Sequence, residues 1–182
     1  MDLNILVWIH QYLVIDQLNG FFIIITNLWG DGVLAVLTTL LLILKKETRL
    51  TGIIILVSLL LNFMIVNAII KPIVARPRPY TIYELQILLP DPRGFSFPSG
   101  HSASVFAFVW AYFITRKDQL RWILLVFALL VCFSRLYLFV HYPTDVLAGI
   151  VIGVICAILS KWFVLRFKTK PWMVAFLEKE SL

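Results

Sequence analysis

Long apolar stretches, separated by short polar segments, run along almost the whole chain of 182 residues. Three of these stretches are nearly free of polar residues: 52–70, 122–140 and 146–164. Each comes close to the roughly 20 apolar residues that a helix needs to cross a bilayer. We therefore predict three strong transmembrane helices.

Two further stretches have the same apolar character but are less regular. Segment 102–114 is shorter, and segment 21–44 is interrupted by Asn27, Gly30 and Asp31. Because both consist mainly of residues that favour lipid, we predict that each also crosses the membrane. The sequence then predicts an all-α, polytopic bundle of five spans.

Residues 1–20 leave a sixth span open as the alternative. Trp8, His10 and Tyr12 suit the headgroup layer, which favours a helix that lies in the membrane interface. The same segment would alternatively help to form an extra span. No Lys or Arg precedes Lys45, so the sequence does not predict the basic region of a cleavable signal peptide.

The composition excludes an ordinary soluble protein. Hydrophobic residues make up 61% of the chain and charged residues 14%, whereas soluble domains carry about 25% charged residues. No polar segment is long enough to bury a core of its own, so we predict one transmembrane domain over residues 1–182. Cys132 and Cys156 lie within predicted spans and lack the spacing of a disulfide or metal site, so we interpret them as small buried hydrophobic residues.

The cations between the apolar stretches predict the orientation of the chain. If the spans alternate, eleven of the 16 Lys and Arg residues fall on one side: Lys45, Lys46, Arg49, Arg116, Lys117, Arg121, Lys161, Arg166, Lys168, Lys170 and Lys179. Four fall on the other side: Lys71, Arg76, Arg78 and Arg93. Because cytoplasmic loops carry the excess of cations, we predict an extracytoplasmic loop at 71–101 and a basic cytoplasmic tail at 161–182. The net charge of +6 thus reflects membrane topology and predicts no nucleic-acid partner.

Three polar clusters lie at the predicted outer ends of the spans, and the first is KPIVARPRPY, residues 71–80. Its three prolines stop the helix and stiffen the loop. Lys71, Arg76 and Arg78 are either anchors that reach the headgroup layer or ligands for an anion.

The second cluster is FSFPSGHSAS, residues 95–104. Pro98 and Ser99 predict a helix start with Ser99 near the N-cap. A helix N-terminus offers free N–H groups to an anion, and Gly100 lets that anion approach the backbone. His101 follows in the first turn. A capped helix with an interfacial histidine is the alternative reading.

The third cluster is SRLYLFVHYPTD, residues 134–145. Arg135 lies inside a predicted span, where an arginine is expected to face the bundle and to mark a functional site. Pro143 suits the first turn of the next helix. Asp145 stands four residues after His141, so its carboxylate can reach one imidazole nitrogen and leave the other free to attack. A purely structural His–Asp pair is the alternative.

Alternating spans bring all three clusters to one face of the membrane. Cations and helix amides that hold a phosphate, together with two histidines, suit phosphoryl transfer, in which one histidine attacks phosphorus and the other protonates the leaving oxygen. A metal-dependent hydrolase would need several converging carboxylates or histidines, whereas the outer side offers only Glu84, Asp91 and Asp145. We therefore predict no metal and no other cofactor.

A lipid or ion transporter is the non-enzymatic alternative. Transporters place their polar groups near the midplane of the membrane or carry internal repeats. The polar groups of this chain gather near one face, which favours an enzyme.

The clusters together resemble the signature of the type 2 phosphatidic acid phosphatase superfamily, which reads KxxxxxxRP, PSGH and SRxxxxxHxxxD. The matching residues are Lys71, Arg78 and Pro79, then Pro98, Ser99, Gly100 and His101, then Ser134, Arg135, His141 and Asp145. Every spacing fits, over the motif region 71–145. Arg76 is also followed by proline, but it stands too close to Lys71 to match.

This resemblance implies an integral membrane lipid phosphatase that works without a metal. It implies that His141 is the nucleophile and forms a phosphohistidine, that Asp145 orients His141, and that His101 is the general acid. By the same resemblance, the phosphate is bound by Lys71, Arg78, Ser99, Gly100 and Arg135.

The substrate is less narrowly defined. An extracytoplasmic site in the plasma membrane suits a lipid phosphate or diphosphate, and small members of this kind are often undecaprenyl diphosphate phosphatases. We expect conversion of undecaprenyl diphosphate to undecaprenyl phosphate, with phosphatidylglycerophosphate or phosphatidic acid as the alternative. The sequence predicts no oligomeric state. Gly149 and Gly153 have GxxxG spacing, which indicates a helix contact within the bundle or between subunits.

Overall fold

The computed structural model describes residues 2–30, 32–83 and 94–179. The regular elements in those ranges are helices, in the order α1 (Asp2–Tyr12), α2 (Asp16–Gly30), α3 (Val33–Leu44), α4 (Arg49–Phe63), the π-helix η1 (Met64–Ile70), α5 (Lys71–Val74), α6 (Pro79–Tyr83), α7 (Gly100–Thr115), α8 (Leu120–Tyr137), α9 (Pro143–Phe167) and α10 (Pro171–Glu178). The predicted all-α class is confirmed. Glu84, Asp91 and Arg93, assigned above to the outer loop, lie outside the described residues.

Three helical segments of the described chain are long and apolar enough to cross a membrane: Arg49–Tyr83, Leu120–Tyr137 and Pro143–Phe167. The pair α2 and α3, bent by 51° relative to each other, makes a fourth when it is counted as one span. α7 has 16 residues and α1 has 11, and neither is among these candidates. The protein is therefore a membrane protein with three to four candidate spans in the described chain, where the sequence predicts five.

The starts of two helices follow the local sequence signals. α7 begins at Gly100 behind the predicted cap Ser99, whose Oγ accepts a hydrogen bond from the Ser102 amide at 3.4 Å. Pro143 lies in the first turn of α9 as predicted, where its missing N–H would have no partner within the helix.

α8 ends earlier than the apolar pattern predicts. The run 122–140 predicts a helix to its last residue, but α8 ends at Tyr137, and Phe139 adopts φ +59°. The following turn is buried in the end of the bundle, so its apolar side chains reflect packing and not a longer helix. The turn carries His141 back over α8, because the His141 amide donates to the Arg135 carbonyl at 3.3 Å.

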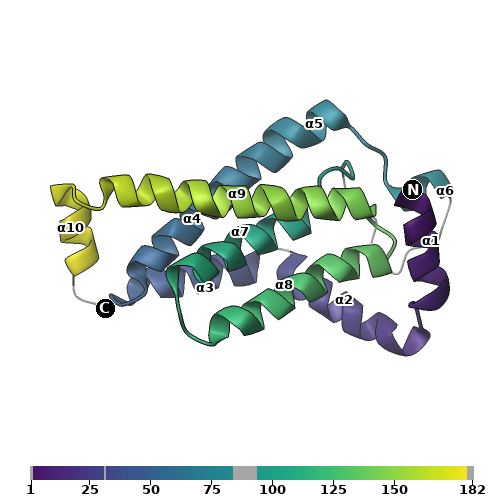
Figure 1. Cartoon of the computed structure of the whole chain (residues 1–182), viewed down its shortest axis with the longest axis horizontal. Coiled ribbons are helices and arrows are strands. Elements are labelled where there is room, and N and C mark those ends of the chain that lie inside the picture. Colours follow the sequence, from purple (N-terminus) through teal and green to yellow (C-terminus); the bar gives the residue numbers. More distant parts are fainter. Residues whose placement is uncertain (1, 31, 84–93, 180–182) are drawn as a thin grey trace.

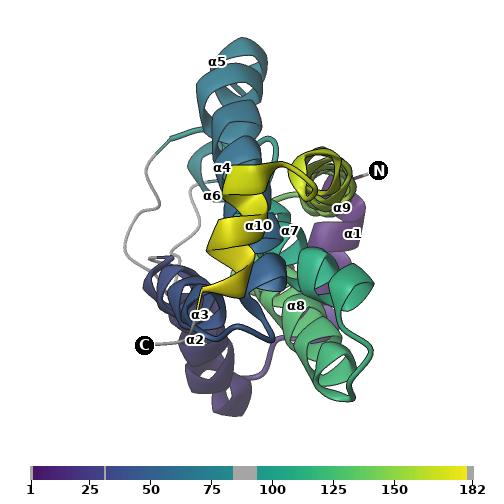
Figure 2. The same cartoon turned by 90° about the vertical axis from the view of Figure 1, so that its left-hand side faces the viewer.

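α7 is the central helix, and most of its residues are buried between α4, α8 and α9 (Figures 1 and 2). Two glycines of α9 allow the closest approach of helices. A Cβ at Gly153 would lie 2.4 Å from the Ala103 carbonyl oxygen, and one at Gly149 would lie 2.7 Å from the Ser99 carbonyl oxygen. The GxxxG spacing therefore marks a helix contact within the bundle, which is one of the two alternatives that the sequence leaves open.

The two ends of the bundle carry different elements (Figure 1). One end carries α1, α6 and the turn between α8 and α9, and we call it the site end. The opposite end carries α10 and the connections α3–α4 and α7–α8. The three polar clusters lie at the site end, as the alternation of spans predicts.

A buried arginine connects α3 and α10 at the opposite end. Arg49 is 5% exposed, and its guanidinium donates to the main-chain carbonyl of Ile43 at the end of α3 and to that of Phe176 in α10, both at 2.9 Å. α10 is thereby fastened to the bundle. α9 continues to Phe167, so the first residues of the segment 161–182 belong to a spanning helix.

Candidate active site

The residues that the sequence selects come from helix ends and turns of the site end. They are Lys71 at the start of α5, Arg78 before α6, Ser99, Gly100 and His101 at the start of α7, Arg135 in the last turn of α8, His141 in the turn after it, and Asp145 in the first turn of α9. Segments far apart in the sequence thus supply one cluster.

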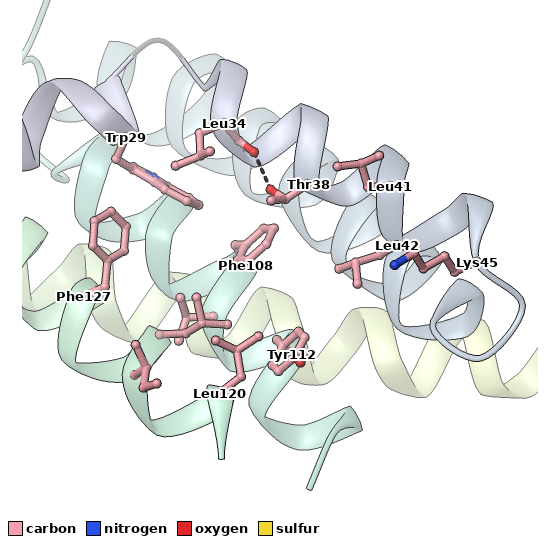
Figure 3. A pocket seen from close by; sticks show the side chains of 13 residues that line it. Trp29, Leu34, Thr38, Leu41, Leu42, Lys45, Phe108, Tyr112, Leu120 and Phe127 are labelled. Carbon is pink, nitrogen blue, oxygen red and sulfur yellow. Dashed lines mark hydrogen bonds between the residues drawn. The ribbon is translucent and has the colours of Figure 1, made fainter. Parts of the chain in front are cut away.

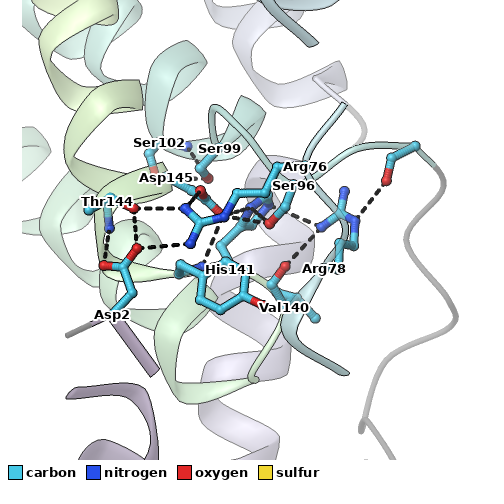
Figure 4. Close-up of polar contacts among 12 residues, drawn as sticks. Asp2, Arg76, Arg78, Ser96, Ser99, Ser102, Val140, His141, Thr144 and Asp145 are labelled. Carbon is cyan, nitrogen blue, oxygen red and sulfur yellow. Dashed lines mark hydrogen bonds and ion pairs between the residues drawn. The ribbon is translucent and has the colours of Figure 1, made fainter. Parts of the chain in front are cut away.

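His141 and Asp145 face each other across the start of α9 (Figure 4). His141 Nδ1 lies 3.6 Å from Asp145 Oδ2, which is slightly beyond hydrogen-bond length. Ser96 joins the two side chains, because its hydroxyl donates to Asp145 Oδ2 at 2.5 Å and its Oγ lies 3.4 Å from His141 Nδ1. The Tyr142 amide also donates to Asp145 Oδ2, at 3.0 Å. The Asp145 carboxylate is thus held by the turn between α8 and α9, which also carries His141.

The other face of the imidazole meets Arg78. Arg78 Nη1 lies 3.2 Å from His141 Nε2 and donates to the Val140 carbonyl at 3.0 Å. Because a guanidinium can only donate, Nε2 is the acceptor and the ring proton is on Nδ1, toward Ser96 and Asp145. His141 is 1% exposed, and this burial, with the nearby charges of Arg135 and Arg78, lowers the pKa of His141 although Asp145 opposes the shift. The imidazole is therefore neutral near pH 7, and its unprotonated Nε2 accepts from Arg78.

Lys71 lies over the N-terminus of α7. A Cβ at Gly100 would lie 3.5 Å from Lys71 Nζ, so the ammonium group and the first amides of α7 enclose the same space. An anion at this point would meet a positive side chain and the positive end of a 16-residue helix. Gly30 makes room on the other side, since a Cβ there would lie 3.4 Å from His101 Nε2. The sequence identifies Gly30 only as an interruption of an apolar run.

Arg135 is buried inside the bundle and does not face lipid, as predicted. It is 2% exposed, and its Nη1 donates to the hydroxyl of Thr26 in α2. Its Nε is buried and has no hydrogen-bond partner in the described chain. The guanidinium therefore keeps its Nε donor unused by the described residues.

Arg76 contacts the site although the motif does not include it. Its Nη1 donates to Asp145 Oδ1 at 2.7 Å and to the Thr144 hydroxyl at 2.8 Å. Its Nη2 donates to Asp2 Oδ2 at 2.9 Å, and its guanidinium lies 3.8 Å from the centre of the Tyr142 ring. Figure 4 shows that the side chain lies between the two carboxylates.

The contacts of Arg76, Ser96 and Asp2 were missed by the sequence reasoning. A second Arg–Pro pair and a serine beside the PSGH motif are the only signals for the first two, and nothing in the N-terminal segment points to Asp2. Which carboxylate an arginine contacts depends on how distant segments pack.

A cavity of about 510 Å³ leads away from the cluster, between α3 and the segment formed by α4 and η1. Lys71, Gly100 and His101 line one part of it, and most of the remaining wall is apolar. Val36 of α3 and Leu60 of α4 line the cavity and are 53% and 56% exposed. The cavity, which we call the site cavity, thus joins the polar cluster to the outer surface of the bundle.

The site offers few ligands for a metal ion. Within the described ranges, no three His, Cys, Asp or Glu side chains come together in a way that could hold one. The chemistry available to the site is that of a neutral imidazole held between a carboxylate and several cationic donors.

A buried His–Asp pair and a helix N-terminus lie together at one end of a bundle with candidate membrane spans, an arrangement that suits phosphoryl transfer at a membrane. The chain belongs to the PAP2 superfamily, whose family model matches residues 51–169. It is a hydrolase of this family and a membrane lipid phosphatase, so the family assigned from the motifs is confirmed.

Proteins similar to this chain are named after different lipid substrates. An undecaprenyl-diphosphatase of Sulfolobus acidocaldarius is 34% identical over 152 residues, which are 82% of this chain and 72% of the relative. The structure of LpxE from Aquifex aeolicus superposes with a TM-score of 0.71 at 30% identity, covering 87% of this chain and 93% of that one. A PAP2 type phosphatidylglycerolphosphate phosphatase from Bacillus subtilis superposes with a TM-score of 0.69 at 27% identity, covering 86% and 81%.

Proposed function

We propose that this protein releases phosphate from a lipid diphosphate by a metal-independent route through a phosphohistidine, and that the substrate is undecaprenyl diphosphate. The observation that carries the proposal is the site cavity, which has Lys71, Gly100 and His101 at its polar end and extends to exposed apolar side chains on the outer surface of the bundle. Such a cavity holds a hydrocarbon chain while its phosphate reaches the polar end. The undecaprenyl-diphosphatase among the similar proteins supports the choice of substrate.

In the first step, the Nε2 lone pair of His141 attacks the terminal phosphorus. The bond from phosphorus to the bridging oxygen breaks, and His101 gives its proton to that oxygen, so undecaprenyl phosphate leaves. Asp145 stabilises the charge that develops on the imidazole of His141.

In the second step, water attacks phosphorus and gives a proton to His101, the phosphorus–nitrogen bond breaks, and inorganic phosphate leaves. The oxygens of the transferred group carry negative charge throughout, and preorganised donors stabilise that charge. The donors assigned to this task are Lys71, Arg78, Ser99, Gly100 and Arg135.

We also propose that α7 is a fifth span and that the site end faces away from the cytoplasm. α7 is surrounded by other helices, so its ends need not reach as far as those of a lipid-exposed helix. The excess of cations at the opposite end supports this orientation. The protein then lies in the plasma membrane with its site on the extracytoplasmic face.

Phosphate release from purified protein in detergent tests the function. Undecaprenyl diphosphate, phosphatidylglycerophosphate and phosphatidic acid are compared, each with EDTA present. We expect the diphosphate to be hydrolysed fastest, EDTA to have no effect, and His141→Ala to abolish release from every substrate. His10→Ala, which removes an exposed histidine of α1, is the matched control. Full activity of His141→Ala, or loss of activity with EDTA, would overturn the proposal.

The orientation has its own test. Tyr83→Cys at the site end and Lys117→Cys at the opposite end both replace exposed residues. An impermeant maleimide should label the first in intact cells and the second only after lysis. The reverse pattern would place the site in the cytoplasm.

A further inference from the structure

Asp145 is held on both of its oxygens. Oδ2 accepts from Ser96 and from the Tyr142 amide, and it faces His141. Oδ1 accepts from Arg76 at 2.7 Å. The side chain of Asp145 is completely buried, so the positive charge of Arg76 offsets part of the solvation that the carboxylate loses by leaving water.

We infer that Arg76, fixed by Asp2, positions Asp145 and thereby sets the orientation and basicity of His141. This inference rests on the proposed role of His141 as nucleophile. Arg76 does not contact His141, so it acts as a positioning residue. Without it, Oδ1 would lose its partner, and only the hydrogen bonds to Oδ2 would hold the carboxylate toward His141.

Asp2 connects helix α1 to Arg76 and Thr144. Its carboxylate accepts from Arg76 Nη2 at 2.9 Å and from the Thr144 hydroxyl at 2.5 Å. Burial alone would raise the pKa of Asp2, but the hydrogen bonds from Thr144 and Arg76 outweigh it and lower that pKa. Arg76 therefore lies between two ionised carboxylates, and the N-terminal helix becomes part of the site.

The inference predicts a shift in pH dependence. His141 faces Asp145 from α9, Arg78 from the segment before α6, Arg135 from α8 and His101 from α7. Removing the Arg76 charge leaves Asp145 without its neighbouring arginine, which favours protonated His141. The acid limb of the kcat profile should then move to higher pH, because only the neutral imidazole attacks.

Arg76→Gln, Arg76→Lys and Asp2→Asn test this inference. A misplaced catalytic group can cost about 100-fold, so we expect Arg76→Gln to lower kcat by about 10- to 100-fold, with KM almost unchanged and the acid limb shifted upward. Arg76→Lys should recover part of kcat, and Asp2→Asn should lose less. Arg116→Gln breaks an Arg–Asp pair at the opposite end and is the matched control.

The outcomes separate the inference from the proposed function. If the wild-type protein releases no phosphate, the proposed function fails. If the wild-type protein is active and Arg76→Gln keeps its kcat, or loses kcat with an unshifted acid limb, Arg76 does not act through His141.

An independent observation concerns Asn62 of α4, in the wall of the site cavity. Asn62 is 3% exposed, and its Oδ1 is buried with no hydrogen-bond partner in the described chain. Two other polar side chains of the wall have partners, since Ser104 accepts from the Trp29 indole at 2.8 Å and Thr39 donates to the main chain at 2.6 Å. An unpaired buried amide destabilises a fold, so it calls for an explanation.

The register of α4 against α7 places Asn62 close to the phosphate site. Ser58, one turn before Asn62, donates to the Ala107 carbonyl at 2.9 Å. The two helices are antiparallel, so Asn62 faces the turn of α7 that contains Ser104 and follows His101 directly. It therefore lies level with about Ala103, roughly 3 Å deeper than His101 at a rise of about 1.5 Å per residue.

We propose that the Asn62 amide binds the inner phosphate of a lipid diphosphate, whose outer phosphate is at His141. This step rests on the proposed function and explains how one site would prefer a diphosphate to a monophosphate. The NH₂ group of the amide can donate to a phosphate oxygen.

Asn62→Leu tests the proposal on a chain-matched pair, farnesyl diphosphate and farnesyl monophosphate. A hydrogen bond to a charged group contributes about 1.5–3 kcal/mol, so kcat/KM for the diphosphate should fall by about 10- to 100-fold while that for the monophosphate stays the same. The Tm should stay equal or rise, because an apolar side chain of similar size replaces an unpaired amide. Thr39→Val, in the same wall, is the control and should not change the preference.

Equal loss on both substrates, or a diphosphate rate equal to that of the wild type, would overturn the role of Asn62. A wild-type protein that hydrolyses only monophosphates would instead overturn the proposed substrate.

Discussion

Two cavities of similar size lie on different faces of α3. The site cavity, of about 510 Å³, lies toward α4, and a second cavity of about 440 Å³ lies between α3, α7 and α8 (Figure 3). We call the second one the α3–α8 pocket. Leu41, Phe108 and Phe127 are among its apolar lining residues, and Trp29 borders both cavities. Volume and apolar walls therefore do not distinguish a site from a gap between helices.

The polar groups distinguish them. In the α3–α8 pocket, the hydroxyl of Thr38 donates to the Leu34 carbonyl and that of Tyr112 donates to Asp118 at 3.0 Å. Lys45 is the single cation in its lining. These hydroxyl groups are already satisfied by the protein and require no ligand.

The site cavity keeps polar groups that need a partner. Asn62 Oδ1 has no hydrogen-bond partner among the described residues, Lys71 lies over a helix N-terminus, and His101 extends the polar part of the wall. A lipid phosphate would offer acceptors to Lys71 and to the Asn62 amide, whereas the walls of the α3–α8 pocket are mainly apolar. The two cavities therefore differ in their polar side chains: these three of the site cavity are available to a ligand, whereas the hydroxyl groups of the α3–α8 pocket already have hydrogen-bond partners in the protein.

The largest expected effect comes from exchanging the lysine of each cavity for alanine. Removing one donor that stabilises a transition-state charge costs about 100- to 1,000-fold in kcat. Lys71→Ala should lose that much, while Lys45→Ala should keep the rate of phosphate release within about twofold, as expected for an exposed charge. Comparable losses in both variants would show that the two cavities are not distinct in function.

Filling the cavities gives a smaller effect. Val36→Trp and Leu41→Trp place the same large side chain on opposite faces of α3, at positions 53% and 59% exposed. A steric conflict of about 1.4 kcal/mol corresponds to a tenfold change, so Val36→Trp should raise KM for a long-chain lipid phosphate about tenfold and leave phenyl phosphate unaffected. Leu41→Trp should change neither value. A loss in Leu41→Trp alone would assign the lipid chain to the α3–α8 pocket.

Much of the fold could be predicted because it depends on local signals. Apolar runs, the cap at Ser99 and the proline at Pro143 predict where α7 and α9 begin. The early end of α8 could not be predicted, since the turn through Phe139 is as apolar as the helix before it. Both the turn and the helix are apolar because both are buried, so the pattern of apolar residues alone does not distinguish a buried turn from a transmembrane helix.

The residues of the candidate site also fall into two groups, those that the sequence identifies and those that it does not. Fixed spacing identifies residues that share a motif, such as His141 and Asp145. It does not identify Arg76, Asp2 or Asn62, because their contacts, or the lack of them, arise only when α1, α4 and α9 pack around the site end. Contacts that depend on how distant helices pack produce no regular spacing of residues that could be recognised in a single sequence.

The smallest effect on activity should come from the wall that both cavities share. α7 lines both, and its position is set by Gly153, where a Cβ would lie 2.4 Å from the Ala103 carbonyl oxygen. Overpacking costs about 1–3 kcal/mol, so Gly153→Ala should lower the Tm in detergent by several degrees and reduce phosphate release only a few-fold. Gly20→Ala, where no atom lies within 4 Å of the added carbon, should leave the Tm equal or slightly higher. An unchanged Tm in Gly153→Ala would mean that α9 can move away from α7, and the separation of the two cavities would then not be fixed by this contact.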